Sequence, residues 1–217
     1  DALGDVIAEV RQHAAWALGN IGAEIAIDPL TNVLQDTNSQ VRASGVLALG
    51  DIGTIASINS LTKALQDSDS QVRANAVLGL SRFESETVIN PLTEALQDSA
   101  PHVRAIAARS VGRFDTELLA DALIAVLQDS DSQVRASVAW ALGDIGSETA
   151  VNSLINTLQD SNPIVRERAV WALGKIDNSD SAINPLINTL LDPDSNVRWR
   201  ASLVLGDIAP ELMITQL

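Results

Sequence analysis

The hydrophobic and polar positions of this chain repeat with a period of 31 residues. Counting forward from Val41, apolar or small residues fall at positions 0, +4, +7, +8 and +11. Residues three or four apart share one side of an α-helix, so this spacing predicts a helix with a single apolar stripe. The same pattern follows a Val-Arg pair seven times, at spacings of 31 residues and, once, 32. The valines are Val10, Val41, Val72, Val103, Val134, Val165 and Val197.

Capping residues predict where this helix, named helix B, begins and ends. An Asn or Asp lies three positions before the valine in most units, and both residues favour the N-cap. Pro101 and Pro163 come one position later, where the first turn tolerates proline. Gly22, Gly53 and Gly146 follow the apolar stripe and are predicted to end helix B. The expected caps are Asn38, Asp69, Asp131, Asn162 and Asp194, with Ala100 as the exception.

A shorter apolar stripe precedes each helix B and predicts a helix A, for example over residues 58–66 and 89–97. Pro29, Pro91 and Pro185 are expected in its first turn. A hairpin of two such helices cannot bury its own apolar side, so neighbouring hairpins must stack on one another.

The recurring motif has a family resemblance. Leu-Gln-Asp-Ser-Asp-Ser-Gln-Val-Arg-Ala, followed by Ala-Leu-Gly-Asp-Ile-Gly, resembles the HEAT repeat in the short bacterial form of phycobilisome lyases. The resemblance implies an all-α fold, a right-handed α-solenoid (superhelix) of stacked antiparallel hairpins. Residues 1–217 are expected to form one array of about six full units with partial units at both ends. Arrays of this kind serve as scaffolds, adaptors or regulatory regions, and in one branch as bilin-attaching lyases.

The ends of the sequence suggest a piece of a longer protein. Leu3-Gly4-Asp5 matches Leu34-Gln35-Asp36, so the chain opens near the end of a helix A, and residues 210–217 resemble a shortened helix A. The first residue is not Met. We therefore expect an excised segment of a larger chain.

Composition narrows the classes of partner. Fourteen Lys and Arg against 28 Asp and Glu give a net charge of −14, which disfavours nucleic acid and anionic membranes as partners. The chain has no Cys, and no apolar run reaches the roughly 20 residues that span a bilayer. These features predict an acidic, cytoplasmic protein with no membrane partner.

The sequence predicts no catalytic residue, metal site or cofactor. An Asp lies five positions before every Val-Arg valine, as Asp36 does before Val41. A catalytic site is one asymmetric cluster, so sevenfold recurrence favours a structural role. We expect this carboxylate to cap helix-end amides or to pair with the Arg across the hairpin turn, Asp36 with Arg42. His13 and His102 lie in different units without a second ligand at metal spacing.

The side of helix B that the core stripe leaves over is the candidate binding surface. It comprises positions −1, +2, +3, +6 and +10, and in HEAT proteins it faces the concave surface of the solenoid. The residues at +6 and +10 differ between units, as a tailored surface requires, and Trp and Arg are enriched at interface hot spots. Alternatively, the Trp rings lean onto neighbouring helices and widen the core. The expected partner-binding residues are Trp16, Leu47, Leu78, Arg82, Arg109, Arg113, Trp140, Arg168, Trp171 and Trp199.

Arg82, Arg109 and Arg113 form a basic island in this acidic sequence. The island is expected either to hold an acidic peptide, phosphate or carboxylate, or only to balance Glu84, Glu86 and Asp115. The sequence thus predicts a scaffold or adaptor that binds a protein or peptide partner, one acidic near these arginines. The family resemblance offers an alternative, a bilin lyase or chromophore chaperone whose arginines meet tetrapyrrole propionates. The absence of Tyr weighs against it, and net charge weighs against a DNA-lesion binder.

Overall fold

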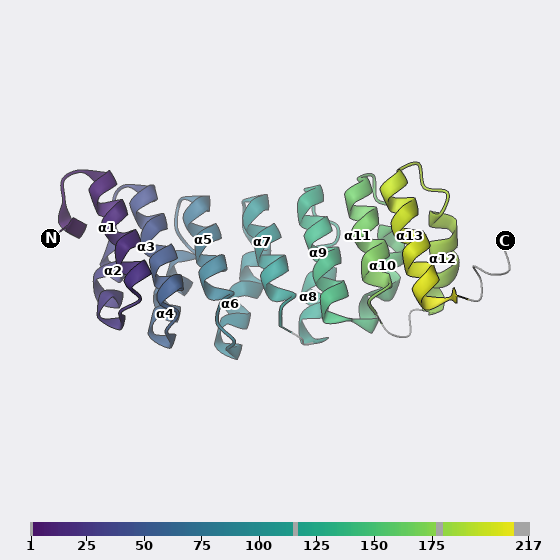
Figure 1. The fold of residues 1–217 in the computed structure, drawn as a ribbon, viewed down its shortest axis with the longest axis horizontal. Coiled ribbons are helices and arrows are strands. Elements are labelled where there is room, and N and C mark those ends of the chain that lie inside the picture. The colour runs from purple at the N-terminus through teal and green to yellow at the C-terminus, as the bar shows by residue number, and fades with distance from the viewer. Residues whose placement is uncertain (1, 115–116, 177–179, 211–217) are drawn as a thin grey trace. The chain divides into compact units, whose positions relative to one another are not determined.

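The computed structural model describes residues 2–114, 117–176 and 180–210, and over these ranges every regular element is a helix. The chain divides into two compact units, Asp1–Ser110 and Val111–Leu217. Each unit is a stack of helical hairpins of the α-solenoid type, in which a helix A and a helix B alternate along the chain (Figure 1). The all-α fold predicted from the sequence is confirmed.

The first unit contains four B helices and the three A helices between them. Its B helices are α1 (Ala8–Ile21), α3 (Ser39–Ile52), α5 (Ser70–Leu80) and α7 (Pro101–Val111), the last of which ends at the boundary between the units. Its A helices are α2 (Ile27–Val33), α4 (Ile55–Ala64) and α6 (Ile89–Glu94). Short 3₁₀ turns are η1 (Ala2–Gly4), η2 (Glu24–Ala26), η3 (Glu86–Val88) and η4 (Ala95–Gln97).

The second unit repeats this plan. Its B helices are α9 (Ser132–Ile145), α11 (Pro163–Leu173) and α13 (Ser195–Ile208). Its A helices are α8 (Ala120–Ile124), α10 (Val151–Thr157) and α12 (Ile183–Thr189), each preceded by a 3₁₀ turn. These turns are η5 (Glu117–Leu119), η6 (Glu148–Ala150) and η7 (Asp180–Ala182).

The predicted caps begin and end the B helices. Asn38 accepts hydrogen bonds from the backbone N–H groups of Gln40 at 2.8 Å and Val41 at 3.3 Å. The side chains of Asp69, Asp131, Asn162 and Asp194 accept equivalent bonds at the starts of their helices. The glycines at 22, 53 and 146 adopt φ values of +68°, +66° and +70°, a left-handed conformation that suits glycine and ends the helix.

The Val-Arg valines are the third residues of their helices, and six of the seven are buried. Val10 is the exception, with 37% of its surface exposed. The short turn η1 precedes α1 at the place where the other repeats have a helix A, and it covers less of the valine. The prediction of a buried valine at the start of each helix B is therefore confirmed for every repeat but the first.

Consecutive B helices approach closely through small residues. A Cβ added to Gly19 of α1 would lie 2.7 Å from the Cα atom of Ala48 in α3. A Cβ added to Gly143 of α9 would lie 2.7 Å from the Cα atom of Ala172 in α11. Gly19 and Gly143 both occupy position +9, and contacts this short leave no room for a side chain at either residue. Leucines fill the remaining space between helices A and B.

Candidate functional site

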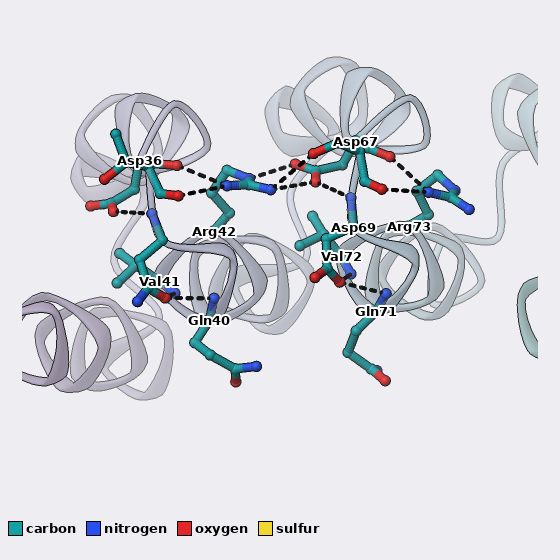
Figure 2. A network of polar contacts seen from close by, with 12 residues as sticks. Asp36, Gln40, Val41, Arg42, Asp67, Asp69, Gln71, Val72 and Arg73 are labelled. Carbon is teal, nitrogen blue, oxygen red and sulfur yellow. Dashed lines mark hydrogen bonds and ion pairs between the residues drawn. The ribbon is translucent and has the colours of Figure 1, made fainter.

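Within each unit a ladder of ion pairs joins successive hairpins, and Figure 2 shows part of it in the first unit. Asp36 accepts hydrogen bonds from Nε of Arg11 at 2.6 Å and from Nη2 at 2.9 Å, a bidentate pair between successive units. The backbone carbonyl of Asp36 accepts a bond from Nη1 of Arg42 at 2.9 Å, and Arg42 in turn pairs with Asp67. The same bidentate pair joins Arg73 to Asp98, Arg135 to Asp160 and Arg166 to Asp192.

The sequence suggested Arg42, across the hairpin turn, as an ion-pair partner of Asp36, and this partner was wrong. Arg42 contacts only the backbone of Asp36, whereas the carboxylate pairs with Arg11, 25 residues earlier. Stacking of hairpins places the guanidinium of one hairpin against the A–B turn of the next hairpin. The second carboxylate contact is local, because Oδ1 accepts the N–H of Asn38 at 2.9 Å.

These contacts stabilise the charged form of the ladder carboxylates. The hydrogen bonds from Arg11 hold the pKa of Asp36 below its usual value, although partial burial opposes that shift. Burial alone would raise the pKa of Asp98, but the bonds from Arg73 and from the N–H of Ala100 outweigh it and lower the pKa. The geometry supports the structural role expected for the recurring Asp.

Large apolar side chains at position +6 of the B helices reach the surface. In the first unit Trp16 is 59% exposed, Leu47 37% and Leu78 42%, on α1, α3 and α5. In the second unit Leu203 at +6 and Trp199 at +2 are exposed on α13. Of the residues proposed from the sequence, the apolar ones that lie most open to solvent are Trp16, Leu47, Leu78 and Trp199.

The exposed side of helix B is narrower than the sequence suggested. Position +2 was expected on it, and Trp199 of α13 is exposed there, yet Ala43, Ala74, Ala105 and Ala136 are buried. Position +3 also turns inward in α5, where Asn75 is buried. Close packing of successive B helices covers these five buried side chains.

Trp140 and Trp171 stack on each other across α9 and α11. Their ring centroids are 6.1 Å apart and their planes differ by 10°. The Trp171 ring leans over Gly143, where an added Cβ would lie 2.8 Å from Cζ3. Both side chains are half-buried. The rings therefore lean onto a neighbouring helix, as the alternative interpretation held, and keep part of their surface open.

Cationic side chains lie over two tryptophans of the second unit. Nζ of Lys175 lies 5.9 Å from the Trp171 centroid, within cation–π range. Burial raises the pKa of Asp144, and the nearby Lys175 opposes the shift. Arg168, on the same helix as Trp171, is half-buried. On α13 the guanidinium of Arg200 lies 5.0 Å from the Trp199 centroid and pairs with Glu167.

The basic island is smaller than the sequence suggested. Arg82 forms an ion pair with Asp51, and not with Glu84 or Glu86 as one of the two alternatives held, because position +10 of α3 lies beside the end of α5. Arg109 and Arg113 are exposed and form no ion pair with a described residue. They fall in different units, and Asp115 lies outside the described residues.

The sequence did not indicate the shallow polar grooves beside the ladder. One groove of about 500 Å³ lies between the hairpins of α2 and α4 and is lined by Asp36, Arg42, Ser60 and Asp67 among others. Across the described ranges, no three His, Cys, Asp or Glu residues gather closely enough to hold a metal ion. Within those ranges, too, every helix is too short or too polar to cross a membrane.

Comparisons with known proteins agree on the type of repeat. YibA of Escherichia coli superposes with a TM-score of 0.65 at 24% identity over 93% of this chain and 78% of its own. A designed armadillo repeat protein in complex with the peptide (KR)4 superposes with a TM-score of 0.60 at 18% identity over 85% of this chain and 99% of its own. Human deoxyhypusine hydroxylase is 27% identical over 95% of this chain and 81% of its own, with a TM-score of 0.48.

A search of curated protein sequences finds no significant match. The sequence profile for HEAT repeats matches residues 1–80, 58–129, 89–160 and 151–217, which together span the chain. The 31-residue period, the capped hairpins and this match lead to one conclusion: the chain belongs to the HEAT-repeat family.

Proposed function

We propose that this chain is a non-catalytic scaffold or adaptor that binds a protein or peptide along the +6 positions of its B helices. The observation that carries the proposal is the exposure of Trp16, Leu47 and Leu78 at equivalent positions of successive helices. Exposed apolar side chains gathered on one surface are typical of sites that a partner covers.

The fold supports a binding role. Stacked repeats form an extended surface on which each hairpin contributes the same few positions, so a long partner can be recognised unit by unit. The designed armadillo protein with a similar fold was solved with a peptide, although at 18% identity it is evidence for the fold alone.

Acidic groups on the partner, one near Arg109 in the first unit and one near Arg113 in the second, are a second part of the proposal. Both guanidinium groups are exposed and form no ion pair with a described residue, so they remain available to a carboxylate. Arg82 contributes less, because Asp51 already neutralises it. That pairing also weakens the bilin alternative, in which Arg82 would bind a propionate.

The experiment is a pulldown with the 217-residue chain, followed by calorimetry of the captured partner with single variants at two salt concentrations. Trp140→Ala or Trp171→Ala should weaken binding by about 2 kcal/mol, the loss typical of a hot-spot aromatic. Arg109→Ala or Arg113→Ala should weaken binding more at low salt than at high salt, because salt screens exposed charges.

Ile55→Ala is the matched control, because Ile55 is exposed at the start of α4, outside the +6 positions. It should leave affinity unchanged. A partner that binds every variant as tightly as the parent would show that the surface lies elsewhere. Capture of a bilin, visible by its absorption, would favour the lyase alternative.

A further inference from the structure

In the first unit the +6 positions form one line, which we call the first-unit row: Trp16, Leu47, Leu78 and Arg109. They lie on α1, α3, α5 and α7, the B helices that follow one another along this unit (Figure 1). All four side chains are exposed. The row is therefore apolar over three helices and cationic on the fourth.

The charges beside the row are arranged as a dipole. Glu9 is exposed on α1, at one end, and Arg109 is exposed on α7, at the other. Between them Asp51 and Arg82 neutralise each other. The A helices of this unit and the loops before them carry the acidic excess, with Glu24, Asp28, Glu84, Glu86 and Glu94 against Lys63. The net charge of −14 belongs to the whole chain, and the charge along the first-unit row differs from it.

The polar groups beside the row suit a helix better than an extended peptide. An extended peptide needs donors and acceptors for its backbone, whereas a helix satisfies its own. Asn75 already accepts a bond from Nε2 of Gln71 at 3.1 Å and is buried. The charged groups of Asp51 and Arg82 also bond to each other. The centre of the row therefore offers mainly apolar contact.

We propose that the first-unit row binds an amphipathic helix of a partner protein, with the acidic N-terminus of that helix at Arg109 and its basic C-terminus at Glu9. This proposal rests on the proposed function and specifies the partner. Packed helices lie about 10 Å apart, and seven residues of a helix rise about 10.5 Å. Apolar residues at a heptad spacing would therefore meet Leu78, Leu47 and Trp16 in turn.

The orientation follows from the charges. Acidic residues in the first turn and basic residues in the last turn stabilise a helix through its dipole. A helix charged in this way is complementary to the row only when its N-terminus lies on α7. Three helix spacings, about 30 Å, correspond to a partner helix of about 20 residues.

The probe is a synthetic fluorescein-labelled 24-residue helix with Leu at three heptad positions, Glu in the first turn and Lys in the last. Its anisotropy is measured with the 217-residue chain at low salt. A second peptide carries Lys in both end turns, and a third carries a central Pro that prevents a continuous helix. We expect the first peptide to bind at least about fivefold more tightly than the second, because the second places a Lys against Arg109 in either orientation.

Variants of the chain identify the contacts. Arg109→Glu should abolish or reverse the preference between the first two peptides, and Leu47→Ala should weaken the first by about tenfold. Lys63→Glu makes the same charge change on an exposed residue of α4 and should alter neither affinity. Circular dichroism checks that each variant remains folded.

Failure of the first peptide to bind, or equal binding of the first two peptides, would overturn the proposal. Equal binding of the Pro peptide would also overturn it and would indicate an extended occupant. A captured partner that loses affinity with Leu47→Ala but binds in extended form would leave the scaffold function intact. A captured partner indifferent to the +6 variants would contradict both.

Discussion

At the residue scale, the recurring Asp stabilises both the turn inside its own hairpin and the contact with the preceding hairpin. Its Oδ1 accepts an N–H in the A–B turn, as in the bond from Ala100 to Asp98 at 2.8 Å. Its two oxygens also receive the guanidinium of the preceding unit, in this case Arg73 at 2.7 and 2.8 Å. One side chain thus fixes the turn and the stacking of neighbouring hairpins.

Asp98→Ala should therefore lower the free energy of unfolding by about 2 kcal/mol, because a part-buried Arg73 and a turn N–H lose their acceptor. Partner binding per folded molecule should remain nearly unchanged. Denaturant unfolding and calorimetry measure the two effects, and Glu94→Ala, on an exposed side chain of α6, is the matched control. Unaltered stability with abolished binding would show that Asp98 belongs to a binding site.

At the scale of helices, the distance between consecutive B helices depends on small residues at position +9. Gly143 brings α9 against α11 and also admits the Trp171 ring. Gly206 holds the same position in α13, but a Cβ there would meet nothing within 4 Å. The two glycines share a place in the repeat and differ in their surroundings.

Gly143→Ala should destabilise the protein by about 1–3 kcal/mol, because the new methyl group would overlap the backbone of Ala172 and push α11 away. It should also disturb the Trp140–Trp171 stack, which near-ultraviolet circular dichroism reports. Gly206→Ala is the matched control and should be neutral or stabilising by up to about 1 kcal/mol, since alanine favours a helix. Equal effects of the two substitutions would mean that close packing does not set the helix spacing.

At the scale of the whole molecule, the ladder couples stability to pH. The pKa values of Asp36, Asp67, Asp98, Asp160 and Asp192 are all lowered by their arginine and N–H contacts, net of burial. A carboxyl group with a lowered pKa in the folded state stabilises that state above its unfolded pKa, about 3.9. The contribution is lost as pH falls through the folded pKa. Asp144 has a raised pKa, so its effect on the pH dependence of stability is opposite, but it is a single group beside the five carboxylates of the ladder.

The melting temperature should accordingly change little between pH 7 and about 5 and fall steeply below about 4. Calorimetric scans at pH 7, 5 and 3 and constant ionic strength measure this. Asp98→Asn removes one titrating member of the ladder, so it should lose less stability than the parent between pH 5 and 3. A melting temperature equal at pH 3 and pH 7 would rule out the ladder as a stabilising network.

Much of the fold was predictable because its signals are local. The apolar stripe, the Asn and Asp caps and the glycines at 22, 53 and 146 each act within a few residues, and all were found where the sequence placed them. The candidate site was predictable only in part. Position +6 was found exposed for Trp16 and Leu78, as the sequence predicted. The sequence did not predict that the Trp140 and Trp171 rings stack on each other.

The sequence by itself determined the repeat, the helical hairpin and the buried valines, because a 3.6-residue periodicity and capping chemistry are properties of a single segment. Only the tertiary structure decided which Arg meets which Asp. From Asp36 on, each recurring Asp stands six residues before one Arg and 25 or 26 after another, so spacing alone favours the wrong, nearer partner. The tertiary structure also decided that the alanines at position +2 are buried and that Arg82 pairs with Asp51. Each depends on how closely one hairpin packs against the next, a distance that small residues set and that no single repeat contains.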